Sequence, residues 1–101
     1  MSSAVVVRYE MKGDTAQENR RLIEQVFAEL AESQPDGLRY ASFLLADGVT
    51  FIHIAITDGE SNPLMKSVAF KEFQREFGDR VSAPQVRSEA TVVGSYRFPS
   101  S

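Results

Sequence analysis

A chain of 101 residues, 43% hydrophobic and 25% charged, has the composition of one soluble globular domain spanning residues 1–101. Fourteen acidic and eleven basic residues are interspersed, and the net charge of −3 gives no basic surface for nucleic acid. The lack of cysteine and the single histidine exclude disulfides, thiolate metal sites and a histidine-rich metal centre within one chain. A carboxylate metal site is not excluded, but no Asp-x-Asp or Glu-x-x-His spacing suggests one, and no metal or cofactor is expected. No run approaches the ~20 apolar residues of a membrane span, and no signal peptide is recognisable, so we expect a cytoplasmic protein without membrane contact.

The first third of the chain predicts a strand and a helix. Residues 4–12 alternate between apolar and mixed positions, and Gly13 and Asp14 end this strand. Thr15 and Glu18 fit a capping box at the start of the helix, and Pro35 follows its end. The helix carries an apolar stripe at helical spacing, which indicates that it lies on a hydrophobic surface. The stripe consists of Leu22, Ile23, Val26, Phe27, Leu30 and Ala31.

Residues 38–58 predict a β-hairpin whose second arm is apolar on both faces. Asp47 and Gly48 form a two-residue turn between β-rich runs, a strong hairpin signal. The resulting register places Ser42 opposite His53 and Tyr40 opposite Ala55. One face of the hairpin then carries Tyr40, Ser42, Leu44, Phe51, His53, Ala55 and Thr57. The other face carries Ala41, Phe43, Leu45, Ile52, Ile54 and Ile56.

The remaining chain predicts a second helix and a last strand. Asn62 can cap a short helical turn, and Ser67 can cap the main helix. Phe70, Phe73 and Phe77 are spaced as one face of this helix. Residues 85–98 predict a more polar strand, as is typical of a sheet edge.

The order β-α-β-β-α-β predicts an α+β, ferredoxin-like fold. Right-handed crossovers produce a four-stranded antiparallel sheet with both helices on one face, and strands one and three lie in its centre. The open face covers roughly 400 Å², about the largest apolar patch that a soluble monomer tolerates. We therefore expect a homodimer through the open sheet face, which makes a dimeric α/β barrel. The alternative is a monomer whose open face is wetted by its polar residues.

Local sequence adds a family resemblance. The element order, the Asp-Gly-Val-Thr-Phe run at 47–51, and a small-x-x-Phe-Lys-x-Phe segment at 67–73 resemble the antibiotic-biosynthesis-monooxygenase-like proteins of the dimeric α/β-barrel superfamily. The resemblance implies a homodimer with a pocket between sheet and helices. Some members of that family oxidise polycyclic phenols with O₂ and no cofactor, some degrade haem, and many have no known activity.

The chain departs from the family at positions that carry its chemistry. Enzymatic members commonly place Glu or Trp late in the third strand and His just before the second helix. Here residues 55–57 are Ala, Ile and Thr, and residues 62–65 are Asn, Pro, Leu and Met. The haem-degrading set is also missing, since residues 7–9 are Val, Arg and Tyr. The fold therefore carries over more safely than the reaction.

His53 is the candidate catalytic residue, because a neutral imidazole lining a cavity can take a proton from a phenol or enol. The alternative is a core or interface histidine bonded to Ser42. Tyr9, Tyr40 and Tyr96 can each orient a ligand with the hydroxyl, although such tyrosines more often pack at strand ends with the hydroxyl in water. Tyr40 lies on the same face as His53 and is the better ligand partner of the three. The predicted ligand-binding residues are Tyr40, Ser42, Phe51, Phe70 and Phe73, although the phenylalanines equally fit a plain core.

Two functions follow from these residues. The first is a dimeric barrel that binds a small hydrophobic or aromatic ligand without the usual family catalytic residues. The second is a cofactor-independent monooxygenase or isomerase that acts on a phenolic molecule with His53 as base. A cavity above ~300 Å³ that reaches His53 favours a ligand site, whereas a packed interior favours a purely structural role.

Overall fold

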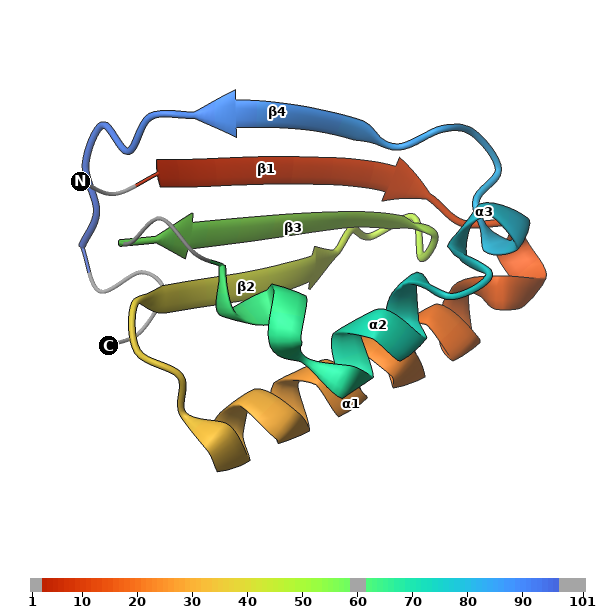
Figure 1. Cartoon of the computed structure of the whole chain (residues 1–101). Coiled ribbons are helices and arrows are strands. Elements are labelled where there is room, and N and C mark those ends of the chain that lie inside the picture. The colour runs from red at the N-terminus through yellow and green to blue at the C-terminus, as the bar shows by residue number, and fades with distance from the viewer. Residues whose placement is uncertain (1–2, 59–61, 97–101) are drawn as a thin grey trace.

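The computed structural model describes residues 3–58 and 62–96 of the chain (Figure 1). The strands are β1 (Ser3–Glu10), β2 (Leu38–Leu44), β3 (Thr50–Thr57) and β4 (Val86–Ala90). The α-helices are α1 (Ala16–Ser33), α2 (Val68–Gln74) and the single turn α3 (Phe77–Arg80). Two 3-10 turns, η1 (Gly13–Thr15) and η2 (Pro63–Lys66), precede α1 and α2.

The four strands form one antiparallel sheet in the order β2-β3-β1-β4, and α1 and α2 lie on the same side of it (Figure 1). This is the ferredoxin-like order predicted from the sequence. The two most apolar strands, β1 and β3, occupy the centre, where each can bury both of its edges. The prediction of the fold class is confirmed.

The hairpin has the predicted register but a different turn. Ser42 pairs with His53 and Tyr40 with Ala55, as the sequence indicates. The pairing stops earlier than expected, because β2 ends at Leu44 and β3 begins at Thr50. Gly48 has a φ of 78°, whereas Asp47 is not among the described non-glycine residues with positive φ. A type I′ turn needs positive φ at both central residues, so the predicted two-residue turn is wrong.

Asp47 instead closes a wider loop with its side chain. Its Oδ1 accepts hydrogen bonds from the backbone N–H groups of Val49 (3.0 Å) and Thr50 (2.9 Å), and its Oδ2 accepts from the Thr50 hydroxyl. A carboxylate that accepts three hydrogen bonds is stabilised in its charged form. The pKa of Asp47 is accordingly below its ordinary value, chiefly because of the Thr50 hydroxyl.

The predicted capping box of α1 is wrong. The Thr15 side chain accepts no capping hydrogen bond; its hydroxyl instead donates toward the backbone oxygens of Lys12 (2.8 Å) and Arg80 (3.1 Å). It therefore links the start of α1 to the end of α3. The far end of α1 stops at Gln34, which has a left-handed φ of 45° and donates its N–H to Leu30. A left-handed residue often ends a helix, but it is usually glycine, and the residue before a proline usually has extended backbone, so Gln34 is an exception on both counts.

The second helix is broken, contrary to the continuous helix that the sequence predicts. α2 ends after two turns, and Glu76 takes a left-handed conformation with a φ of 61° before α3 begins. The interruption frees backbone oxygens at the end of α2. Arg80 donates to two of them, those of Phe73 (2.5 Å) and Arg75 (3.0 Å). The caps predicted at Asn62 and Ser67 are both present, with side-chain oxygens that accept from the N–H groups of Leu64 and Phe70.

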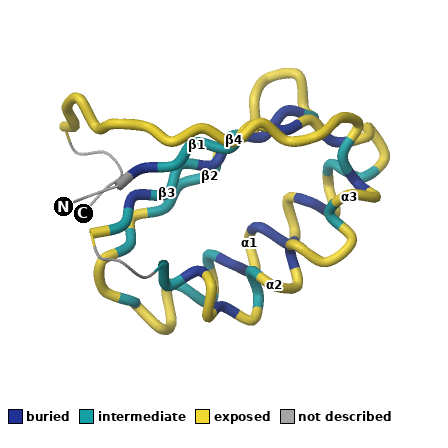
Figure 2. The backbone as a smooth tube through the Cα atoms, turned by 45° about the horizontal axis from the view of Figure 1, so that its top comes forward, coloured by how far each residue is buried: buried dark blue, intermediate teal, exposed yellow. Residues whose placement is uncertain are grey.

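The last strand is shorter than the predicted 85–98. β4 spans Val86–Ala90, all five residues are exposed, and residues 91–96 continue without strand pairing (Figure 2). Residues 97 and 98 lie outside the described part of the chain. Because β4 pairs only with β1 in the described sheet and all five of its residues are exposed, it forms the polar edge that the sequence indicates.

The core lies between the sheet and the helices. Figure 2 shows the inward sides of α1 and α2 buried against the sheet. The buried apolar cluster consists of Tyr9, Met11, Leu22, Ile23, Val26, Phe51, Leu64 and Phe73. On the opposite face Ile52 and Ile54 are half-buried within one chain, and Phe43 is 38% exposed. One face of the sheet is thus covered by helices. The other carries apolar residues at its centre, of which Ala4 and Ile56 are buried, together with Arg8 and Arg39.

Glu29 joins the two helices. Its carboxylate accepts hydrogen bonds from the Ser67 hydroxyl (2.5 Å) and from the N–H groups of Ala69 (2.9 Å) and Val68 (3.2 Å). Negative charge at a helix N-terminus is favourable, because the first N–H groups have no partner within the helix. The Ser67 hydroxyl, followed by these N–H groups, lowers the pKa of Glu29 below its ordinary value of 4.5.

We predict that Glu29→Gln lowers the midpoint of thermal unfolding at neutral pH, since the amide removes the negative charge from the start of α2. Because the folded state lowers the pKa of Glu29, its stabilisation is full above about pH 4.5 and is lost as pH falls through the folded pKa. The gap between wild type and variant should therefore close in acid. Thermal unfolding followed by circular dichroism between neutral and acidic pH measures this gap. Glu32→Gln on the exposed side of α1 is the control, and a constant gap would contradict the prediction.

Candidate functional site

His53 lies in the middle of β3 on the helix-covered face and is 5% exposed. Its Nε2 lies 2.6 Å from the Tyr9 hydroxyl of the neighbouring strand β1. Its Nδ1 lies 2.6 Å from the Tyr40 hydroxyl and 2.9 Å from the Ser42 hydroxyl, both on β2. Three adjacent strands therefore contribute to a site in which both nitrogens of one imidazole have polar partners.

The hydrogen bonds continue from Tyr9 into the helices. The Asn19 side-chain amide on α1, which is completely buried, donates from Nδ2 to the Tyr9 hydroxyl at 3.0 Å. The Arg80 Nε on α3 donates to the Asn19 Oδ1 at 3.4 Å. We call Arg80, Asn19, Tyr9, His53 and Tyr40 the polar chain. It crosses the core from α3 to β2, and every member is connected to the next.

Burial decides the protonation states within the polar chain. Loss of solvent lowers the pKa of His53 from 6.5 to about 4, because an imidazolium is poorly solvated there. The same effect raises the pKa of Tyr40 to about 12 and raises that of Tyr9 further. At neutral pH the imidazole and both phenols are therefore uncharged. Arg80 carries the charge of the chain, and its guanidinium lies 5.7 Å from the Phe73 ring centroid and 5.8 Å from that of Phe77.

A cavity of about 320 Å³ opens beside the polar chain, between the sheet and α2. His53, Tyr9 and Tyr40 form the polar part of its wall. The apolar lining comprises Val5, Val7, Ala55, Leu64, Met65, Phe70, Phe73 and Phe77. Gln74, Gln85 and Arg87 also line the cavity and are exposed, so the opening to solvent lies on the α2 and β4 side.

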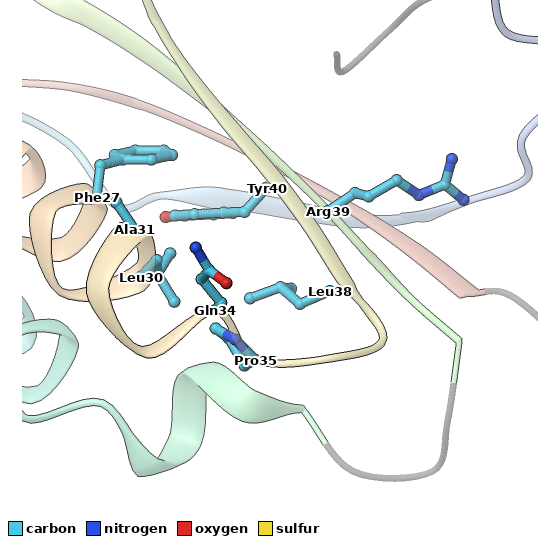
Figure 3. A pocket seen from close by; sticks show the side chains of 8 residues that line it. All are labelled: Phe27, Leu30, Ala31, Gln34, Pro35, Leu38, Arg39 and Tyr40. Atoms are coloured by element: carbon cyan, nitrogen blue, oxygen red, sulfur yellow. The ribbon is translucent and has the colours of Figure 1, made fainter. Parts of the chain in front are cut away.

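A second hollow, of about 340 Å³, lies at the other side of Tyr40, between the end of α1 and β2 (Figure 3). Phe27 stacks on the Tyr40 ring with centroids 5.1 Å apart and separates this hollow from the core. Arg39 extends to the opposite side of β2 from Tyr40, so its guanidinium does not point into the hollow (Figure 3). The titratable side chains gather at the first cavity instead, which makes the first cavity the better candidate site.

The structure brings together most of the residues singled out in the sequence. The Tyr40 and Ser42 hydroxyls both contact the His53 Nδ1, and Phe70 and Phe73 line the cavity. Two predicted ligand-binding residues, Ser42 and Phe51, do not line it. The Phe51 side chain is 2% exposed and stacks on Tyr9 with centroids 5.6 Å apart.

Three site residues were missed or misplaced by the sequence analysis. Tyr9 was expected at a strand end with its hydroxyl in water, but the hydroxyl is buried against His53. Tyr96 is exposed, as expected. Asn19 and Arg80 were not identified at all. The sequence offered one indication that Asn19 is buried, since it lies one turn before Leu22 and Ile23 on the buried stripe of α1. The local sequence pattern gave no such indication for Arg80.

Comparisons with known proteins identify the fold. A protein assigned as an antibiotic biosynthesis monooxygenase from Bacteroides thetaiotaomicron superimposes with a TM-score of 0.78 at 13% identity, covering 91% of this chain and 90% of that one. Rv0793 from Mycobacterium tuberculosis gives 0.74 at 16% identity, covering 94% and 98%. The chain has the fold of the antibiotic-biosynthesis-monooxygenase-like proteins.

Another neighbour with this fold has a named activity. A point mutant of SnoaB, a cofactor-independent oxygenase from Streptomyces nogalater, superimposes with a TM-score of 0.67 at 14% identity, covering 93% of this chain and 95% of that one. No family model matches this sequence, and no curated protein matches it either. The structural superpositions confirm the resemblance predicted from the sequence at the level of the fold.

Residues 3–58 and 62–96 contain no group of three or more His, Cys, Asp or Glu side chains that could hold a metal ion. Among the helices described, none is long and apolar enough to cross a membrane.

We predict that His53 makes stability depend on pH. The unfolded chain takes up a proton near pH 6.5 and the folded protein only near pH 4. The free energy of unfolding should therefore fall as pH is lowered through this window, by about 2 kcal/mol between pH 7.5 and pH 5. Chemical denaturation at several pH values measures the slope, and His53→Gln should remove that part of it. Because the chain has one histidine, NMR of its ring protons gives the pKa directly, and a value near 6.5 would refute this assignment.

Proposed function

We propose that this protein binds a small, largely aromatic or aliphatic molecule in the cavity between the sheet and α2, as one subunit of a homodimer. The observation that carries the proposal is the 320 Å³ cavity with apolar walls and its polar groups gathered around His53. Ligand sites are typically apolar cavities of about 300–1,000 Å³ with a few oriented polar groups. The size lies at the lower end of this range and favours a molecule of one or two rings.

The cavity wall supports a ligand with one polar end. Val7 and Ala55 on the sheet and Phe70 and Phe73 on α2 offer apolar surfaces on opposite sides. Aromatic rings at such positions favour stacked or edge-on contacts with a second ring. The Tyr40 hydroxyl lies beside His53, where a polar atom of the ligand can bond to it. The likeness to SnoaB, a cofactor-independent oxygenase, supports a small-molecule role only as a fold-level analogy.

We predict that 2-naphthol binds in this cavity and that Ala55→Phe weakens binding by at least about tenfold, because the added ring occupies the space between β3 and α2. Fluorescence titration of the naphthol measures the affinity. Ala28→Phe makes the same substitution on the exposed side of α1 and should leave the affinity unchanged. Equal affinities for the two folded variants would place the ligand elsewhere, and absence of saturable binding to the wild type would reject a site for two-ring aromatics.

The homodimer part of the proposal rests on the open face of the sheet. Ile52 and Ile54 of β3, Val6 of β1 and Phe43 of β2 lie there, and none of them is fully buried within one chain. Burial of such a sheet face against a second apolar face lowers the free energy, because apolar surface is removed from water. The expected area of roughly 400 Å² is only about half of the 800 Å² per partner in a typical stable interface. The rim of the sheet must therefore contribute as well.

Residues 91–96 supply apolar surface at that rim. Val93 is 97% exposed and Val92 is 44% exposed, directly after the edge strand β4. Exposed valines in a segment that follows an edge strand and belongs to no strand itself are suited to pairing with a second copy of the chain. The proposed dimer thus joins two open sheet faces, with this segment of each subunit extending the contact.

We predict that the protein sediments as a dimer at micromolar concentration and that Ile54→Lys weakens the dimer by at least about tenfold, because a charge placed in the centre of the open face must lose its water. Analytical ultracentrifugation over a concentration series measures the equilibrium. Gln25→Lys on the exposed side of α1 adds the same charge and should have no effect. A wild-type monomer of 11.2 kDa throughout the series would reject the dimer.

Catalysis with His53 as base is the second candidate. Its support is that His53 is unprotonated at neutral pH and lines the cavity. A base of pKa about 4 is weak, however, and both nitrogens already have partners within the chain. Binding is therefore the better-supported function.

If the protein is an enzyme of this kind, His53→Ala should lower turnover of an electron-rich naphthol by roughly 10²–10⁴-fold, the usual contribution of a general base. Oxygen uptake in the presence of 1-naphthol measures it, with Gln25→Lys as the control for an exposed substitution. Unchanged uptake by a folded His53→Ala protein would remove His53 from the mechanism.

A further inference from the structure

The donors and acceptors of the polar chain can be assigned from its Arg80 end. A guanidinium has N–H donors and no acceptor, so the Asn19 atom that faces Arg80 is the carbonyl Oδ1. The Asn19 Nδ2 then faces Tyr9 and can only donate to its hydroxyl. The charge of Arg80 thus determines which way the Asn19 amide points, although Arg80 itself does not touch His53.

The same reasoning fixes the Tyr9 hydroxyl. Its oxygen accepts from Asn19, and its other hydrogen-bonding contact in the described structure is the His53 Nε2. The hydroxyl proton therefore goes to Nε2, which must accept it. A neutral imidazole carries one N–H, and with Nε2 as acceptor that N–H is on Nδ1. The Nδ1–H then donates toward the oxygens of Tyr40 and Ser42.

We propose that Arg80 and Asn19 are positioning residues that hold His53 in its Nδ1–H tautomer, so that the polar chain ends at the cavity in the O–H group of Tyr40. Every bond in the chain donates in the direction from Arg80 toward the cavity. The Tyr40 oxygen accepts from His53, and its own proton can go to the neighbouring Ser42 hydroxyl, to which Tyr40 is hydrogen-bonded, or to a ligand. A ligand oxygen that accepts a hydrogen bond, such as a carbonyl or an oxyanion, can take this proton in place of the Ser42 oxygen. The preference for an acceptor ligand rests on the proposed binding function, whereas the assignment of the His53 tautomer does not.

The tautomer is tested on the protein without ligand. In ¹⁵N-histidine-labelled protein at neutral pH, the single histidine should show a protonated Nδ1 and an unprotonated Nε2. Asn19→Asp is the decisive variant, because a carboxylate accepts from both Arg80 and the Tyr9 hydroxyl. The Tyr9 oxygen can then accept from His53, and the proton should move to Nε2. One hydrogen bond corresponds to roughly a fivefold preference between the two forms, which is readily measured.

Two outcomes would overturn the assignment. The first is an Nε2–H tautomer in the wild type, which decides the question even if Asn19→Asp does not fold. The second is a folded Asn19→Asp protein that keeps the wild-type tautomer. Arg80→Lys retains a donor-only cation and should keep the Nδ1–H form. Arg80→Met removes the donor, leaves the amide free to turn and should give a mixture of both forms. A purely structural role for Arg80 predicts no difference in tautomer between these two variants.

The preference for an acceptor ligand has its own test with two probes of similar size. Acetophenone has only an acceptor oxygen, and indole has only an N–H donor. Acetophenone should bind more tightly than indole, and Tyr40→Phe should weaken acetophenone by roughly fivefold while leaving indole unchanged. An equal loss of affinity for both probes would reject the preference for an acceptor ligand and would not affect the assignment of the His53 tautomer. If neither probe nor 2-naphthol binds, the proposed function fails, and the NMR result is unaffected.

Discussion

An imidazole buried under two helices must find all of its hydrogen bonds inside the protein, because an unpaired polar group in the core costs several times the net value of one hydrogen bond. His53 meets this demand with hydroxyls from both neighbouring strands. Those hydroxyls bring their own requirements, which Asn19 and Arg80 meet in turn. Within the described residues, no buried side-chain nitrogen or oxygen is left without a partner. The polar chain is the consequence of placing one histidine at the centre of the sheet.

The break in the second helix and the candidate site are two results of one arrangement. Because α2 stops at Gln74 and Glu76 turns the backbone, Arg80 can reach back to the freed oxygens of Phe73 and Arg75. The same guanidinium contacts Asn19, so the anchor of the polar chain is held by the end of the helix that walls the cavity. A continuous helix would have used these carbonyl groups for its own hydrogen bonds, which would leave none of them for Arg80.

The cavity exists because the helices cover the sheet unevenly. The helices α1 and α2 lie over one face, yet β4 is exposed along its whole length. The space beneath α2 is therefore open toward β4, where Gln85 and Arg87 stand at its margin. The opposite face of the sheet carries no helix among the described elements. An opening on one side and an apolar surface on the other are compatible, so a second subunit on the open face would leave the cavity accessible.

The strand order, the hairpin register and the face shared by His53, Tyr40 and Ser42 were all determined by the sequence itself. These features follow from side-chain alternation and from turn positions, which act over a few residues. The roles of Tyr9, Asn19 and Arg80 were decided only by the tertiary structure. Asn19 and Arg80 are 61 positions apart, and a polar side chain on a helix or a turn looks the same in a sequence whether it faces water or the core.

The break at Glu76 and the early end of β4 were also decided only by the tertiary structure. Local propensity allowed the helix and the strand to continue, but the helix breaks where Arg80 binds the freed carbonyl oxygens, and β4 pairs with β1 only as far as Ala90. Local pattern therefore determined which face of the sheet carries the site. Only the packing of distant segments determined how its hydrogen bonds are directed, because the direction depends on partners that the chain brings together after it folds.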